Sequence, residues 1–123
     1  MKAEDLMIGD WVMLDGKEPK QITGLKTHSC KHGYVQIKNL DCSAEYLEPV
    51  PLTPEILEKN GFKYMTGLWY IQTKEIRPIQ IVFKETNVIT LSINCTPVPI
   101  NLKHVHQLQH ALRLYGIEKE IIL

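Results

Sequence analysis

Two prolines near the middle of the chain place the strongest constraint on its fold. Pro49 and Pro51 lie in the segment 48–52, which reads Glu-Pro-Val-Pro-Leu. Proline has no backbone N–H and drives the residue before it into an extended conformation, so neither a helix nor a central strand continues through this segment. A chain of 123 residues forms one domain or two very small ones. We therefore divide the chain into residues 1–50 and 51–123.

The first half has the pattern of a small β structure. Short runs of strand-forming residues occupy 11–14, 20–25, 34–37 and 42–47. Gly24 weakens or bulges the second run. The opening Ile8-Gly9-Asp10, followed by Val12, resembles the start of SH3-like barrels. We expect a small SH3-like barrel in this half.

The second half alternates between helix and strand signals. Thr53 as N-cap and Pro54 at the first helical position predict a helix over 54–60. An apolar stripe predicts a second helix over 102–114, capped by Asn101. Strands are expected over 62–65, 69–72, 79–83 and 89–93. The predicted fold class is mixed β and α+β: an SH3-like barrel packed on an antiparallel sheet with two helices.

The chain ends in three apolar residues, Ile121, Ile122 and Leu123. An apolar strand left unpaired is an edge that promotes aggregation, so we expect residues 118–122 to form a short, paired strand. Its partner is the protein's own sheet or the same strand of a second chain. A strand that follows a helix usually returns to the local sheet, which favours a monomer over a homodimer.

Charge and cysteine content exclude several classes of protein. Fourteen basic side chains balance fourteen acidic ones, which argues against a strongly cationic nucleic-acid binder. The three cysteines are odd in number and show no CxxC spacing, as expected for free thiols in a reducing cytoplasm. No apolar run is long enough to cross a membrane, and the first residues do not resemble a signal peptide. We expect a cytoplasmic protein that does not contact membranes.

Several segments resemble one family in the same order along the chain. They are 6–12, 48–53, 56–57, 61–62 and 105–109. The family consists of uncharacterised small bacterial proteins, often found on prophages and other mobile elements. The sequence departs from it at His110, where the family more often has Asn, and at Cys30 and Cys42. The resemblance implies a soluble intracellular bacterial protein and supplies no activity.

Histidines in the second predicted helix have the spacing of a zinc site. His106 and His110 are four residues apart, which places two imidazoles on one helix face. A zinc protease would need a glutamate after the first histidine, where this chain has Gln107. The apolar stripe is centred on the opposite face, so we interpret both histidines as solvent-facing. His104 falls at the edge of the stripe, where we expect its ring to pack.

A second group of potential metal ligands lies between two predicted strands. His28 and His32 flank Cys30, and Cys42 is the one cysteine placed to complete a set. Paired zinc ligands usually have C-x₂₋₄-C or H-x₃₋₅-H spacing, which the two histidines match. The alternative is a polar hairpin tip, which we favour. We therefore expect neither a metal nor another cofactor.

The residues 17–32 form a basic loop with a net charge of +3, although the first fifty residues as a whole carry −2. An aromatic residue beside a basic loop stacks on nucleic-acid bases in some proteins, and Tyr34 follows this loop. Lys20, Lys26 and Lys31 would then contact phosphates. The simpler interpretation is a solvated loop.

No nucleophile elbow, phosphate-binding loop or dinucleotide fingerprint is present, so we assign no catalytic residue. We expect a non-catalytic interaction or accessory protein with an unknown protein partner. A weak nucleic-acid-binding module is the second hypothesis, and a small enzyme the third. The candidate binding residues are Lys20, Lys26, Lys31, Tyr34, His106 and Gln107.

Overall fold

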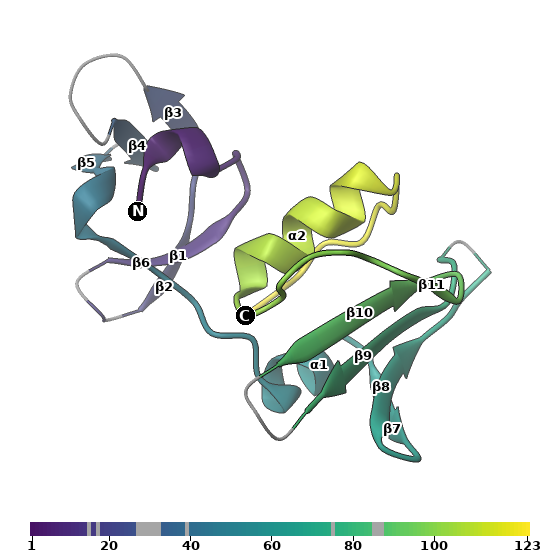
Figure 1. The fold of residues 1–123 in the computed structure, drawn as a ribbon. Coiled ribbons are helices and arrows are strands. Elements are labelled where there is room, and N and C mark those ends of the chain that lie inside the picture. Colours follow the sequence, from purple (N-terminus) through teal and green to yellow (C-terminus); the bar gives the residue numbers. More distant parts are fainter. Residues whose placement is uncertain (15, 17, 27–32, 39, 75, 85–87) are drawn as a thin grey trace. The chain divides into compact units, whose positions relative to one another are not determined.

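The computed structural model describes residues 1–123 except 15, 17, 27–32, 39, 75 and 85–87 (Figure 1). The chain divides into two compact units, which we call unit 1 (Met1–Val50) and unit 2 (Pro51–Leu123). The described strands form three antiparallel sheets, and two α-helices lie in unit 2. The predicted mixed α+β class is therefore confirmed.

The described residues of unit 1 form six short strands and two 3₁₀ turns. These are η1 (Ala3–Asp5), β1 (Trp11–Leu14), β2 (Pro19–Gln21), β3 (Gly24–Lys26), β4 (Tyr34–Ile37), β5 (Leu40–Ser43), η2 (Ala44–Tyr46) and β6 (Leu47–Pro49). They form two three-stranded sheets with the orders β2-β1-β6 and β3-β4-β5. Both sheets contribute to one core, which contains Val12 and Leu47 from the first and Val35, Ile37 and Cys42 from the second.

The predicted second strand of unit 1, residues 20–25, is in fact two strands in different sheets. The backbone of Ile22 bonds to Gly9 and Asp10, whereas the N–H of Thr23 donates to the carbonyl of Gln36 in β4. The chain thus passes from one sheet to the other between these residues. Within the described part of unit 1 no sheet closes into a barrel, and the SH3-like barrel is not confirmed.

The strand predicted over 42–47 is also divided. Its first part belongs to β5, the turn η2 follows, and β6 pairs with β1 in the other sheet. The turn at Ala44 redirects the chain, and the N–H of Ala44 donates to the carbonyl of Gly33 over 2.9 Å. Pro49 ends β6, which is an edge strand and so tolerates a residue without an N–H.

In unit 2, the part of the chain that the structure describes forms a five-stranded sheet and two helices. Its elements are α1 (Pro54–Lys59), β7 (Lys63–Met65), β8 (Leu68–Ile71), β9 (Ile79–Phe83), β10 (Ile89–Ile93), β11 (Thr96–Pro97) and α2 (Val105–Leu114). The strand order is β11-β10-β9-β8-β7. Ile79 and Ile81 are buried and alternate with half-buried Gln80 and Val82, so one face of the sheet carries the core.

Helix α1 confirms its predicted caps. The Thr53 hydroxyl accepts from the N–H of Ile56, and Gly61 has the positive φ of 88° typical of a residue just after a helix. The N–H of Phe62 donates to the carbonyl of Leu57 over 3.0 Å, and that of Gly61 to the carbonyl of Glu58. This pair of bonds is the Schellman motif, which ends the helix firmly.

Helix α2 begins three residues later than predicted, and Asn101 does not cap it. Leu102 forms an isolated bridge with Ile89, and the carbonyl of Lys103 accepts from the N–H of Leu52. These tertiary contacts keep the chain extended up to His104, which is the residue before the helix. The cap is instead the side chain of Gln107, whose Oε1 accepts from the backbone N–H groups of Lys103 and His104.

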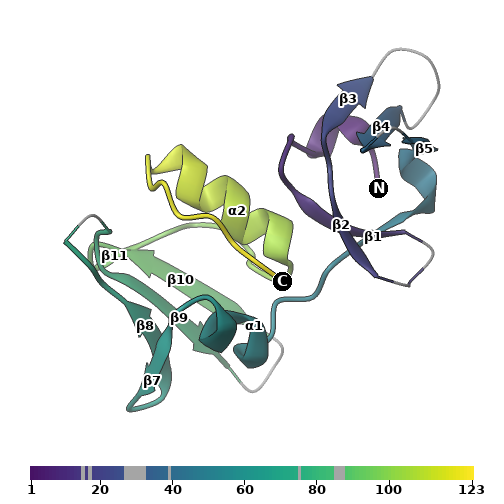
Figure 2. The ribbon, with the colours of Figure 1, turned by 180° about the vertical axis from the view of Figure 1, so that it is seen from behind.

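The C-terminal strand predicted over 118–122 is not formed. The segment runs back along α2 in both views (Figures 1 and 2). The side-chain amide of Asn60 fixes it: Nδ2 donates to the carbonyl of Ile122 over 2.8 Å, and Oδ1 accepts its N–H over 2.7 Å. One side chain therefore satisfies both backbone groups that a neighbouring strand would have paired, while Ile121 is buried.

Candidate functional site

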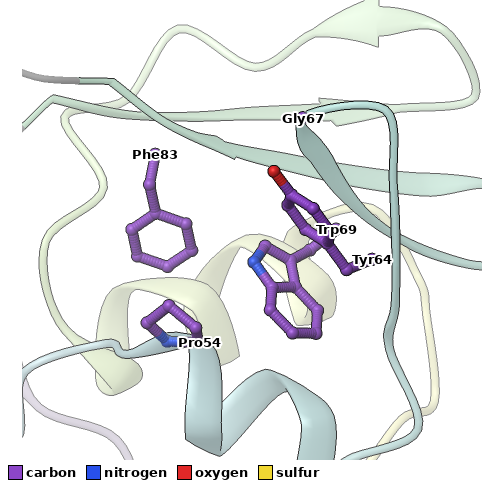
Figure 3. A pocket seen from close by; sticks show the side chains of 5 residues that line it. All are labelled: Pro54, Tyr64, Gly67, Trp69 and Phe83. Carbon is purple, nitrogen blue, oxygen red and sulfur yellow. The ribbon is translucent and has the colours of Figure 1, made fainter.

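Unit 2 has a surface groove with aromatic walls. We call it the aromatic groove; its volume is about 410 Å³, and its lining residues are Pro54, Tyr64, Gly67, Trp69 and Phe83 (Figure 3). They come from α1, β7, the β7–β8 turn, β8 and β9. Side chains far apart in the sequence thus form one surface within a single unit.

Strand register explains why these rings share one face. Tyr64 lies directly opposite Trp69, and Trp69 lies opposite Ile81, a buried core residue. Directly opposed residues in an antiparallel sheet point to the same side. Phe83 is two residues beyond Ile81 and so also points there. The alternation that builds the core therefore also places three aromatic rings on the core face near one end of the sheet.

A tight turn sets the edge of the groove. Thr66 and Gly67 both have positive φ, 45° and 86°, as a two-residue hairpin between β7 and β8 requires. Gly67 has no atoms within 4 Å of where a Cβ would lie, so its role is conformational and it does not crowd the groove. The turn fixes Tyr64 opposite Trp69, with ring centroids 5.3 Å apart and planes tilted by 55°.

The groove combines apolar walls with a hydrogen-bond donor. Tyr64 is 62% exposed, while Trp69 and Phe83 are half-buried and held in place. The indole nitrogen of Trp69 lies on the side of the ring that faces Phe83 and Pro54 (Figure 3). Among the residues that the structure describes, none accepts a hydrogen bond from this nitrogen. Its N–H is therefore available to an acceptor bound in the groove.

A second hollow borders the groove at Phe83. We call it the lysine hollow; its volume is about 670 Å³, and Leu52, Phe83, Lys84, Val88, Ile89, Asn101 and Lys103 line it. Of these described lining residues, two are lysines and none is acidic. Phe83 is common to both sites, so an extended ligand that occupies one site is adjacent to the other.

The predicted basic loop is only partly described. Lys26 in β3 and Tyr34 in β4 are direct cross-strand partners, so the structure places these two positions side by side. Lys20 belongs to the other sheet, and its ammonium lies 3.5 Å from the carboxylate of Glu18. Lys31 lies outside the described residues. The structure thus brings together two of the four predicted residues and does not bring Lys20 to them.

The interpretation of His106 as solvent-facing is wrong, since only 9% of it is exposed. It lies between two other imidazoles: it stacks on His104 with centroids 5.8 Å apart and meets His110 edge-on at 5.6 Å. His104 is half-buried, as expected at the edge of the stripe. Burial, followed by the positive charge of Lys103, lowers the pKa of His104 below its ordinary value.

Gln107 has a local structural role as the cap of α2. The described residues contain no group of three or more His, Cys, Asp or Glu side chains placed to hold a metal ion. The possible ligands His28, Cys30 and His32 lie outside the described part of the chain, and Cys42 is buried in the core of unit 1.

From the sequence, Tyr64, Trp69 and Phe83 were assigned to strands, and the groove that they line was not predicted. The available signal was the parity of the strands, because Trp69 and Phe83 lie two residues from the apolar residues Ile71 and Ile81 and so share their face. What the sequence does not show is how far the helices extend over that face. Helix α1 has only six residues, and its first residue, Pro54, lines the groove beside the rings.

Comparisons with protein-family models, with curated proteins and with solved structures found no match to this chain. Within the described residues, no helix has both the length and the apolar character needed to cross a membrane.

Proposed function

We propose that the protein is a non-catalytic interaction module that binds a segment of a partner protein in the aromatic groove. The observation that carries this proposal is the convergence of Tyr64, Trp69 and Phe83 on one open surface. Aromatic side chains dominate binding energy at protein interfaces because they bury a large area and lose few rotamers. Two half-buried rings and one exposed ring supply anchors that are already in position before a partner binds.

A peptide-display library tests this function. Binding peptides are selected on the wild-type protein, and their affinity is measured by calorimetry. We expect Tyr64→Ala to weaken the selected peptides by at least about ten-fold, because truncating a central aromatic anchor typically costs about 2 kcal/mol. The matched control is Tyr46→Ala in unit 1, since Tyr46 is 60% exposed and lies outside the groove. Equal effects of both substitutions would refute the proposal.

The two tryptophans allow a direct readout. In a Trp11→Phe variant, Trp69 is the remaining indole, and its emission reports on the groove. We expect selected peptides to shift this emission with the same affinity that calorimetry gives. If the peptides bind without any change in Trp69 emission, the binding surface lies elsewhere.

The second candidate is a weak nucleic-acid-binding module, and the pairing of Lys26 with Tyr34 favours it. A labelled single-stranded oligonucleotide titrated at several salt concentrations tests it, because each released counterion makes binding salt-dependent. We expect no tight binding at physiological salt. Tight binding that is lost on replacing Lys20, Lys26 and Lys31 with Glu would instead support this candidate. A small enzyme remains the third hypothesis.

We also propose that unit 1 has an SH3-like topology. Its supporting features are the passage of one run of chain from β2 into β3, the 3₁₀ turn η2 before the last strand, and the pairing of that strand with β1. For the whole chain, the family resemblance supports an accessory protein of the bacterial cytoplasm, of the type associated with prophages. The hydrogen bonds of Ile122 to Asn60 of the same chain support a monomer.

A further inference from the structure

The aromatic groove and the lysine hollow are neighbouring hollows that share one of their described lining residues. Phe83 lines both, and Lys84 directly follows it at the end of β9. Lys103 comes to the same hollow from the extended segment before α2, where the carbonyl of Lys103 is bonded to Leu52. A ligand with an apolar part and an anionic part matches this arrangement in both shape and charge.

The two lysines carry charge that described residues do not neutralise. Neither Lys84 nor Lys103 has a carboxylate of a described residue within 4 Å of its ammonium. The positive charge of Lys103 also disfavours the protonated form of His104. An acidic group on a ligand would be attracted to this position.

The walls of the groove suit proline. A polyproline II segment has no internal hydrogen bonds, so its carbonyls are free to accept, and its rings pack on flat aromatic side chains. Tyr64, Trp69 and Phe83 supply such surfaces, and the Trp69 indole N–H supplies a donor. The segment is already extended before binding, so little ordering entropy is lost.

We infer, on the basis of the proposed function, that the partner segment is a proline-rich peptide with acidic residues, its prolines in the aromatic groove and its carboxylates beside Lys84 and Lys103. A single-stranded nucleic acid also combines flat rings with anions. Its affinity, however, comes from many phosphate contacts, whereas two lysines line this hollow and acidic and basic residues balance over the chain. The peptide is therefore the better match.

Three synthetic peptides and one oligonucleotide test the inference on the full chain. The acidic probe is Pro-Pro-Leu-Pro-Pro-Glu-Glu. The neutral probe has Gln for both Glu residues, and the third has Ala for every Pro. A short oligo-deoxythymidine serves as the nucleic-acid probe. We expect saturable binding of the acidic probe by calorimetry, weaker binding of the neutral probe and no binding of the alanine probe.

Two lysine substitutions identify where the acidic residues bind. The double change Lys84→Gln and Lys103→Gln should weaken the acidic probe about five-fold, as expected for two exposed ion pairs, and change the neutral probe less than two-fold. Lys63→Gln is the matched control, because Lys63 is exposed and lies opposite Tyr70, on the other face of the sheet from Tyr64. Its effect on both probes should be under two-fold.

The outcomes separate this inference from the proposed function. Display-selected peptides that need Tyr64 and Trp69 but lack prolines and ignore the lysines overturn the inference and leave the proposed function intact. Selected peptides that ignore the groove aromatics overturn both. If the oligonucleotide binds more tightly than the acidic probe and depends on Lys84 and Lys103, the surface binds nucleic acid and the inference is wrong.

Discussion

The two units place their aromatic residues differently. In unit 1, Trp11, Tyr34 and Tyr46 lie on β1, β4 and η2, and none is buried. Unit 2 has six aromatic residues, of which three converge on one groove, and Phe62 alone is buried. Both cores are therefore largely aliphatic, and clustering at the surface distinguishes unit 2. Exposed aromatic residues mark a binding surface when they converge, and isolated ones need no such explanation.

The units also differ in how buried polar side chains are used. In unit 1, the carboxylate of Asp10 accepts from the N–H of Met7, three residues away, and stabilises a local turn. In unit 2, Asn60 binds Ile122, a residue 62 positions away. A local contact depends only on residues that are close to it in the sequence. The long-range contact makes the closure of unit 2 depend on its last residues.

The largest change in stability is expected when a buried aromatic residue of unit 2 is compared with an exposed one. Phe62 is 2% exposed and Tyr64 is 62% exposed, although they are two residues apart. Phe62→Ala should lower the free energy of unfolding by about 3–5 kcal/mol, because it leaves a cavity in the core. Tyr64→Ala should lower it by only about 1 kcal/mol, because the exposed ring loses its contact with Trp69 and leaves no cavity in the core. Urea denaturation of both variants measures the difference.

A large loss of stability in Tyr64→Ala would contradict the separation between core and groove. In that case the ring would be a structural element, and its effect on peptide binding would need to be measured at low temperature on the folded fraction.

The next effect concerns the long-range polar contact. Asn60→Ala removes the partner of both backbone groups of Ile122 and should cost about 1–3 kcal/mol, because each of the two lost hydrogen bonds contributes about 0.5–1.5 kcal/mol. Amide hydrogen exchange should accelerate at Ile122, while β1 and β4 of unit 1 exchange as in the wild type. Unchanged exchange at Ile122 would show that Asn60 does not hold the C-terminal segment.

A smaller effect is expected at the start of α2. Gln107→Ala removes the acceptor of two backbone N–H groups and should cost about 1 kcal/mol, the usual value of a helix cap. Gln80→Ala, on a strand of the same unit, is the control and should cost less, because no cap depends on it. Denaturation midpoints compare the two. A loss at Gln80 as large as that at Gln107 would argue against the capping role.

Helices and strands whose ends are set by nearby residues were predicted well from the sequence. The N-cap Thr53 and the C-terminal Gly61 fix α1, and period-two alternation fixes β9 and β10. Elements whose limits depend on distant contacts were predicted less well. The bridge between Leu102 and Ile89 delays α2, and Asn60 replaces the expected strand partner of the C-terminus. Propensity is a weak guide where tertiary contacts decide.

The candidate site was harder to predict for the same reason. The helical wheel centred the covered face on the apolar stripe, but the buried residues of α2 also include His106 and Gln109, so the covered face is wider than the stripe. The short length of α1 was predicted, but the groove also depends on which strands pair and in which register, and one sequence does not specify that pairing. Gln107 was selected as a binding residue, yet its hydrogen bonds are those of a cap.

The smallest expected effect is a pH dependence at His104. Burial and Lys103 lower its pKa in the folded state, so below the ordinary value of 6.5 the unfolded chain binds a proton more readily. The stability that this histidine contributes is therefore complete above pH 6.5 and is lost as the pH falls through the folded-state pKa. We expect the loss to be below about 0.5 kcal/mol, because solvent screens a half-buried group. Urea midpoints measured from pH 7.5 to 5 should fall less in His104→Gln than in the wild type, while Gln80→Ala, which removes no titratable group, keeps the wild-type slope. An equal or steeper fall in His104→Gln would show that its imidazole is not the group that titrates.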